Sequence, residues 1–148
     1  MNRIVVKFAV AAIGVLTSNP VPAQVSPTTS KPVRVRITKG PEIEMSKTFL
    51  TIISWTTSNP GGSPKHYGVV HYGTDPKNLN EAARSPIRLN LDHASTVFRV
   101  RLDNLRPGTT YYYIVGSMEA NGTDDGAKSA IKQFITPGES QRAGRAWD

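Results

Sequence analysis

Apolar and polar residues alternate along most of this chain in short segments, and residues that favour turns separate the segments. Alternation with a period of two is typical of half-buried β-strands, and no segment keeps a helical period over more than two turns. The first strand is expected over residues 33–38, with a break at Gly40 and Pro41 and a short continuation over residues 42–45. The other strands are expected at residues 48–57, 65–73, 81–90, 95–102, 110–118 and 128–136. This spacing predicts an all-β, seven-stranded sandwich of two sheets with Greek-key connections.

Gly, Pro, Asn and Asp gather between the expected strands, most densely at residues 58–64, 74–80 and 119–127. These residue types favour tight turns, because they tolerate or impose the backbone angles that turns need. Residues 119–127 are therefore expected to form the hairpin loop before the last strand.

The N-terminal segment departs from this alternation. Arg3 and Lys7 supply positive charge, residues 8–16 are apolar, and the segment ends in small residues at Ala23. This order is typical of a secretory signal peptide and predicts cleavage between Ala23 and Gln24. The apolar run is shorter than the roughly 20 residues that a membrane-spanning helix needs, and no later segment is long enough either. We expect an exported protein, in the periplasm, at the cell surface or outside the cell, with no membrane span.

The expected organisation places one domain between two short terminal segments. A signal peptide covers residues 1–23, an N-terminal arm 24–32, the domain 33–137 and a C-terminal tail 138–148. The arm is rich in Ser, Thr and Pro, which favours an extended or flexible segment. The domain is long enough to bury a single core.

Composition narrows the function classes. Cysteine is absent, which excludes disulfides, thiolate metal sites, a lipid anchor and cysteine catalysis. An exported domain without disulfides fits a bacterial source better than an animal extracellular module. The net charge is +7, but the basic residues are scattered rather than grouped in runs. A solvated surface is favoured over nucleic-acid binding, while attraction to an anionic polysaccharide stays open.

Several short motifs resemble those of fibronectin type III domains. Residues 53–55 form the pattern of an apolar residue, any residue and Trp, and residues 134–137 have the sequence FITP. Residues 105–115 have the sequence LRPGTTYYYIV, which is similar to the corner between two strands of that family. The segment VHYGTDP at residues 70–76 resembles one subgroup, the N-terminal domain of purple acid phosphatases and related metallophosphoesterases. The resemblance implies an immunoglobulin-like fibronectin type III sandwich.

The same resemblance implies structural roles for four residues. Trp55 is expected to fill the core between the sheets, and Leu105 and Pro107 to shape the corner. The Tyr111 hydroxyl is expected to form a hydrogen bond with the corner backbone. The phosphatase subgroup uses this sandwich as a non-catalytic domain, and the G-D-x-x-Y and G-N-H-E metal-ligand motifs of the catalytic domain are absent here. A two-metal phosphatase centre needs such ligands, so we expect no catalytic residue, no cofactor and no enzymatic activity.

The candidate metal ligands do not form an obvious set. His66 and His71 are five residues apart on one expected strand, so they point to opposite faces and cannot share an ion. His93 precedes the next long strand. Asp124 and Asp125 lie in the expected hairpin loop, where a calcium site is conceivable and a solvated turn is favoured. No metal site is expected.

The outward positions of three neighbouring strands are unusually apolar and aromatic. When the inward positions are assigned as in the family, the residues between them along each strand point outward. These outward residues are Tyr67, Val69, His71, Tyr112, Ile114, Ile131, Gln133 and Ile135. Contiguous exposed apolar patches usually mark an interface, and tyrosine is enriched in such contacts. Two alternatives remain at this point: a strand shifted by one residue, or a terminal segment that covers the face.

The sequence therefore predicts a secreted, non-enzymatic binding or assembly module that uses this face for a protein partner or for self-association. One alternative is a stand-alone domain of the phosphatase N-terminal type that serves a catalytic metallophosphoesterase on another chain. A second alternative is a carbohydrate or matrix-binding module that uses Tyr67, Tyr112 and Trp147.

Overall fold

The computed structural model describes residues 35–139 of the 148-residue chain. The expected signal peptide with its cleavage point, the N-terminal arm, and all of the C-terminal tail except its first two residues lie outside the described residues. No helix in the described range is long and apolar enough to cross a membrane.

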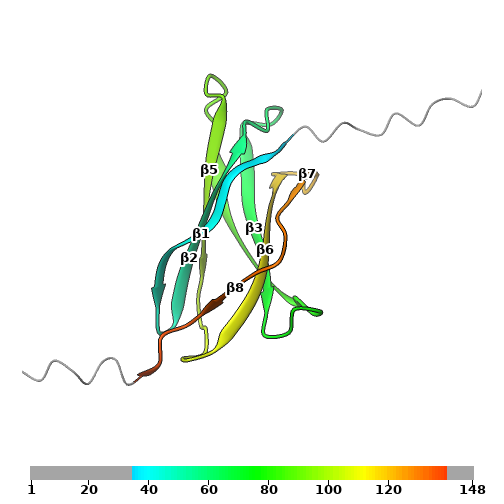
Figure 1. Ribbon diagram of the computed structural model, residues 1–148. Coiled ribbons are helices and arrows are strands. Elements are labelled where there is room, and N and C mark those ends of the chain that lie inside the picture. The colour runs from blue at the N-terminus through cyan, green and yellow to red at the C-terminus, as the bar shows by residue number, and fades with distance from the viewer. Residues whose placement is uncertain (1–34, 140–148) are drawn as a thin grey trace, which may run out of the picture. The chain divides into compact units, whose positions relative to one another are not determined.

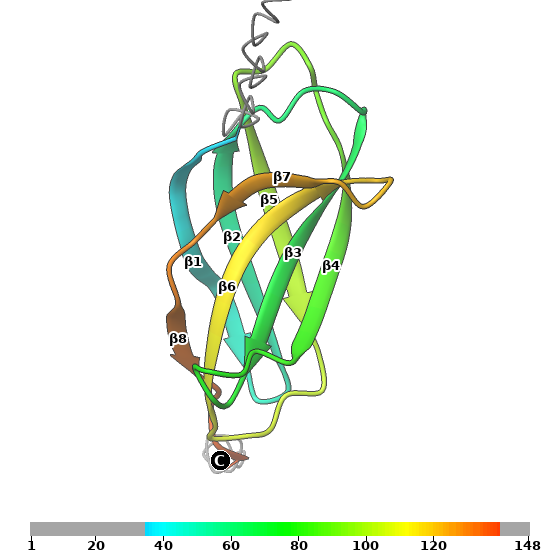
Figure 2. The same cartoon turned by 90° about the vertical axis from the view of Figure 1, so that its right-hand side faces the viewer.

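Eight strands, all paired antiparallel, form two sheets within residues 35–139 (Figures 1 and 2). The three-stranded sheet has the order β1 (Ile37–Lys47), β2 (Leu50–Ser58), β5 (Ser95–Leu102). The five-stranded sheet contains β4 (Glu81–Arg88), β3 (Lys65–Gly73), β6 (Thr110–Glu119), β7 (Asp124–Lys128) and β8 (Lys132–Ile135). Both β7 and β8 pair with β6. The all-β sandwich predicted from the alternation is confirmed.

The first strand departs from its expected form. Gly40 and Pro41 were expected to break it, but β1 is assigned as one strand through both residues. The two residues are joined by a cis peptide bond, and the pairing with β2 shifts between Lys39 and Glu42. The strand therefore accommodates the turn-forming residues as an irregularity in its register rather than as an end.

The last expected strand, residues 128–136, is instead two strands. β7 begins at Asp124, inside the expected hairpin loop, and β8 ends at Ile135. Between them, Ser129 keeps contact with β6 through its backbone and its side chain: its N–H donates to the Val115 carbonyl at 3.0 Å, and its hydroxyl accepts from the Val115 N–H at 3.0 Å. Figure 2 shows the chain bending away from β6 between the two strands.

The core lies between the two sheets, and in β2, β5 and β6 it is made by every second residue. Trp55 stacks on Phe98, with ring centroids 5.5 Å apart. Gly68 lies on the inner side of β3, where a Cβ atom would come within 3.1 Å of both Trp55 Cη2 and Phe98 Cδ1. The missing side chain of Gly68 therefore makes room for the tryptophan ring.

The turn between β5 and β6 is held by a tyrosine hydroxyl. Tyr111 is buried, and its hydroxyl accepts a hydrogen bond from the Arg106 backbone N–H at 3.0 Å. The Leu105 side chain is buried beside it, and the Thr109 hydroxyl donates to the Pro107 carbonyl at 2.9 Å. These contacts fix the direction in which β6 leaves the turn, and thereby which of its side chains face outward.

The pKa of Tyr72 leads to a prediction about alkaline pH. Burial, together with a hydrogen bond to Glu81 and the charge of that carboxylate, raises the pKa of the Tyr72 hydroxyl from 10.0 to about 12. Well below pH 10.0 the residue is protonated in both the folded and the unfolded chain, so its contribution to the free energy of unfolding does not change with pH. Above that value the unfolded chain loses the proton first, and the free energy of unfolding should fall until the pH passes the folded pKa.

Urea titrations at a series of pH values from about 9 to about 11.5 would measure this fall. Tyr72→Phe should make the fall shallower. It should not remove it, because burial also raises the pKa of Tyr113. A variant curve that parallels the wild-type curve would show that Tyr72 does not contribute.

Candidate binding face

The outer face, defined as the surface of β3, β6 and β8 that points away from the core, has the orientation expected from the sequence. Val70 and Tyr113 are buried in the core, so their neighbours along each strand point outward. The strand register brings the outward residues together: His71 lies opposite Ile114, and Tyr112 lies opposite Gln133. Tyr112 and Ile114 are half-buried, whereas His71 and Gln133 are exposed.

Two isoleucines make the β8 side of this face apolar. Ile135 pairs with Thr110 at the end of β8 and is 63% exposed. Ile131 is 52% exposed. The sequence had suggested that it belongs to a continuous last strand, but it precedes β8.

Val69 was expected to be part of the exposed patch, and that expectation is wrong. Its register is outward, but only 7% of the residue is exposed. Its partner on β6 is Gly116, and the side chain of Lys128 lies against that glycine, 3.7 Å from where a Cβ would be. The apolar stem of a lysine can cover apolar surface in this way. Val69 therefore offers little exposed surface to a partner.

Tyr67 lies at the β4 side of the face with two cations over its ring. Lys65 Nζ is 5.6 Å from the ring centroid, and Arg84 Cζ is 5.2 Å from it. Cations over aromatic rings are attracted by the ring quadrupole. A hollow of about 280 Å³ lies next to this residue, lined by Val69, His71, Ala82, Ala83, Arg84 and Met118. This side of the face is thus more polar than the β8 side.

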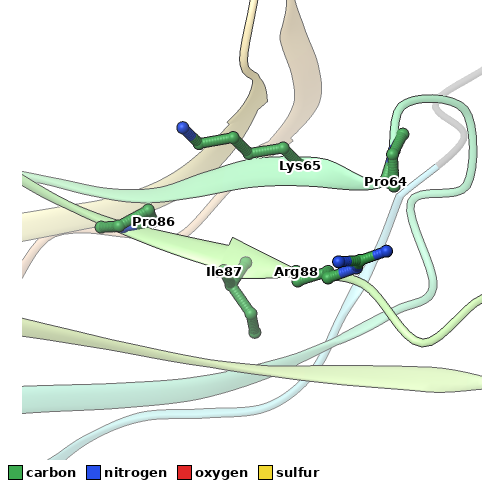
Figure 3. Close-up of a pocket in the computed structure, with 5 residues that line it drawn as sticks. All are labelled: Pro64, Lys65, Pro86, Ile87 and Arg88. Carbon is green, nitrogen blue, oxygen red and sulfur yellow. The ribbon is translucent and has the colours of Figure 1, made fainter.

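Other apolar residues are exposed away from the outer face. A hollow of about 540 Å³ at the end of the β3–β4 pair is lined by Pro64, Lys65, Pro86, Ile87 and Arg88 (Figure 3). On the three-stranded sheet, Met45 and Val97 are each 43% exposed. Near them, Arg99 Nε donates to Glu44 Oε2 at 2.7 Å, so ion pairs cross this surface.

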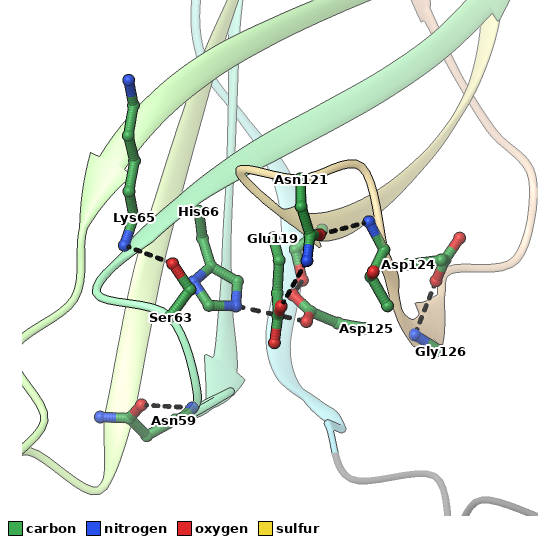
Figure 4. Close-up of polar contacts among 12 residues, drawn as sticks. Asn59, Ser63, Lys65, His66, Glu119, Asn121, Asp124, Asp125 and Gly126 are labelled. Carbon is green, nitrogen blue, oxygen red and sulfur yellow. Dashed lines mark hydrogen bonds and ion pairs between the residues drawn. The ribbon is translucent and has the colours of Figure 1, made fainter.

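One constellation was missed by sequence reasoning. His66 on β3, Glu119 at the end of β6 and Asp125 on β7 place one possible ligand atom each within 4.8 Å of one another. Figure 4 shows the imidazole and the two carboxylates pointing toward each other. The histidines had been compared only with one another. His66 finds its neighbours across the strand pairing, where Glu119 is its register partner, and across the hairpin that brings Asp125 back.

A comparison with known protein families shows to which family this chain belongs. The sequence model of the family described as purple acid phosphatase, N-terminal domain, matches residues 32–136. The chain belongs to this family. The resemblance predicted from residues 70–76 and from the corner at residues 105–115 is confirmed.

Solved structures of similar fold come from different sources. The sensor domain of the anti-sigma factor RsgI4 in Pseudobacteroides cellulosolvens is 17% identical, with a TM-score of 0.48, over 70% of this chain and 74% of that chain. The FN5 domain of Drosophila Lar is 19% identical, with a TM-score of 0.41, over 70% of this chain and 96% of that one. The fibronectin type III domain of human fibronectin type III domain containing protein 3 is 15% identical, with a TM-score of 0.41, over 71% and 88%. The sequence matches no curated protein.

Family membership fixes the class of this domain. It is a fibronectin type III-like sandwich of the type that forms the non-catalytic N-terminal part of purple acid phosphatases. The match spans all eight strands of the described range.

Proposed function

We propose that this chain is an exported, non-enzymatic protein-binding module whose contact surface is the outer face. The observation that carries the proposal is the group of apolar side chains on and beside β6 and β8. Ile135 is 63% exposed on the same side of the sheet as Tyr112 and Ile114, and Ile131, which precedes β8, is 52% exposed. Water contact with such side chains is unfavourable, and burying them against a partner gives back about 25 cal/mol for each Å² of apolar surface. The predicted signal peptide supports the exported location.

The composition of the face favours a protein over a sugar. Interfaces concentrate their energy in a few central residues, among which tyrosine is enriched. Tyr112 and Ile114 lie on β6, between β3 and β8, and are therefore the expected central contacts. A sugar-stacking residue would need a free aromatic face, and two cations already lie over the ring of Tyr67, one of the residues of the carbohydrate alternative.

Family membership favours a second, more specific candidate for the partner. The domain family is named for its place in purple acid phosphatases, so a catalytic metallophosphoesterase domain is a natural occupant of the outer face. Self-association through the same face is the other candidate. Both use the same residues, and they differ in whether the purified chain assembles by itself.

Ile114→Lys tests the proposal. The side chain points away from the core, so the variant should fold like the wild type by circular dichroism. It should lose self-association in sedimentation velocity, or lose a metallophosphoesterase partner in a pull-down, because a lysine in a desolvated patch leaves an unpaired charge. Val97→Lys is the matched control, since Val97 is a similarly apolar residue on the outer side of the other sheet.

Three outcomes would contradict the proposal. Unfolding of Ile114→Lys would show that Ile114 belongs to the core. Unchanged assembly and unchanged partner binding in that variant would place the contact elsewhere. Loss of binding in Val97→Lys alone would assign it to the three-stranded sheet.

A further inference from the structure

We propose that His66, Glu119 and Asp125 bind one divalent transition-metal ion, with Zn²⁺ the best match. One imidazole nitrogen and two carboxylates supply the ligand atoms, and all three lie within 4.8 Å of one another. Ligand atoms around tetrahedral zinc lie about 3.5 Å apart. His66 Nε2 and Asp125 Oδ1 are already 3.3 Å apart, so a small shift of the half-buried Glu119 side chain would complete the set.

The burial of His66 without a hydrogen-bond partner favours a role as a metal ligand. The side chain is completely buried, yet neither ring nitrogen makes a hydrogen bond with any partner. Its Nε2 atom is 3.3 Å from Asp125 Oδ1, close enough for an ion pair but without hydrogen-bond geometry. A buried polar group without a partner costs free energy, and native structures contain few of them. A metal ion at Nε2 would satisfy this nitrogen.

The surrounding residues hold both carboxylates in place. Ser117 Oγ donates to Asp125 Oδ2 at 2.6 Å, and Asn121 Nδ2 donates to Glu119 Oε2 at 3.3 Å. The β6–β7 hairpin is closed by a hydrogen bond from the Glu119 N–H to the Thr123 carbonyl at 2.8 Å. Hydrogen bonds of this kind orient ligands in known metal sites. Each carboxylate keeps one oxygen free of these bonds and available to an ion.

The space around Glu119 is also consistent with a role as a metal ligand. A Cβ atom at Gly62 would lie 2.7 Å from Glu119 Oε1, so the glycine leaves room for the carboxylate beside the loop before β3. Asp125 has only 7% of its side chain exposed, and its Oδ1 atom lies 3.3 Å from His66 Nε2. A divalent cation would neutralise both carboxylates.

The donor set selects the class of metal. Nitrogen and carboxylate ligands suit zinc and its neighbours in the first transition row. Calcium takes six to eight oxygen ligands, and magnesium prefers oxygen and water, so neither matches a site centred on an imidazole. Three protein ligands leave one position of a tetrahedral ion open for water or for a side chain of a partner.

Isothermal titration of the untagged, chelator-treated chain with ZnCl₂ tests the site. We expect saturable binding of one ion per chain and a higher melting temperature in ZnCl₂ than in MgCl₂. Co²⁺ should give visible absorption bands from the same site. Glu119→Gln should weaken zinc binding about tenfold or more and remove the cobalt bands, while the zinc-free protein melts as the wild type does. Glu42→Gln, an exposed carboxylate of β1, should change nothing.

The proposal is overturned by wild-type protein that binds no zinc at stoichiometric concentration. It is equally overturned if Glu119→Gln binds zinc as tightly as the wild type, since the ion would then be held elsewhere. In either case the His66–Asp125 contact is a structural ion pair that fastens β7 to β3.

Discussion

Gly68→Ala should destabilise this domain by about 1–3 kcal/mol, although alanine is ordinarily better than glycine inside a strand. The added methyl group would meet Trp55 Cη2 and Phe98 Cδ1, each at 3.1 Å, and Phe98 Cβ at 3.2 Å. These two rings are stacked on each other and buried, so neither can retreat without losing contacts elsewhere. Overpacking of this kind forces side chains off their preferred rotamers. Urea denaturation of both proteins gives the difference directly.

Gly138→Ala is the matched control. No atom lies within 4 Å of a Cβ at Gly138, so this substitution should change the free energy of unfolding by less than about 0.5 kcal/mol. A neutral or stabilising Gly68→Ala would mean that the Trp55 and Phe98 rings have more freedom than their stacked arrangement indicates.

Tyr111→Phe should cost about 1–3 kcal/mol of stability. The substitution leaves the ring and its stacking on Phe134 in place and removes only the hydroxyl. The Arg106 N–H, which donates to that hydroxyl at 3.0 Å, would then lack its partner in a partly buried position. An unpaired polar group costs more than the hydrogen bond itself contributes, because it has also lost contact with water.

Tyr112→Phe provides the comparison one residue further along β6. Tyr112 points outward and is half-buried. Removing its hydroxyl should therefore change the free energy of unfolding by less than about 0.5 kcal/mol. Equal losses in the two variants would contradict the assignment of inward and outward positions on β6. The test therefore also checks the register on which the outer face depends.

Alternation and turn residues were sufficient to predict most of the architecture. The expected bounds of β3 and β5 agree with the structure, residues 65–73 and 95–102. The residues of β6 that were expected to point inward are buried. Side chains of a strand alternate between its two faces, so every second residue faces the core. Resemblance motifs then supplied the family, since the tyrosine corner lies at a fixed place in this type of sandwich.

The features that were not predicted depend on contacts between strands. Val69 follows the outward alternation but is covered, since Gly116 lies opposite it and Lys128 lies over that glycine. At the split between β7 and β8, the Ser129 hydroxyl accepts the Val115 N–H in place of a backbone carbonyl. Neither effect can be recognised from the alternation of apolar and polar residues along the sequence.

The candidate metal ligands were hidden for a related reason. His66, Glu119 and Asp125 come from different strands, and their spacing along the chain matches no ligand motif. The pairing of His66 with Glu119 requires the exact β3–β6 register, and the approach of Asp125 requires that β7 begins inside the expected loop. The available signal was a histidine at an inward position of a strand, where an apolar residue is usual.

Site-specific photocrosslinking in cells that export this chain tests the proposed contact surface most directly. A benzoylphenylalanine would replace Ile135 on the outer face or, as a control, Val97 on the other sheet. The account predicts one discrete adduct from position 135, identified by mass spectrometry as a metallophosphoesterase catalytic domain or a second copy of this chain. That adduct should disappear when Ile114→Lys is added, and position 97 should give none. An adduct from position 97 alone, an adduct unaffected by Ile114→Lys, or no adduct from either position would contradict the account.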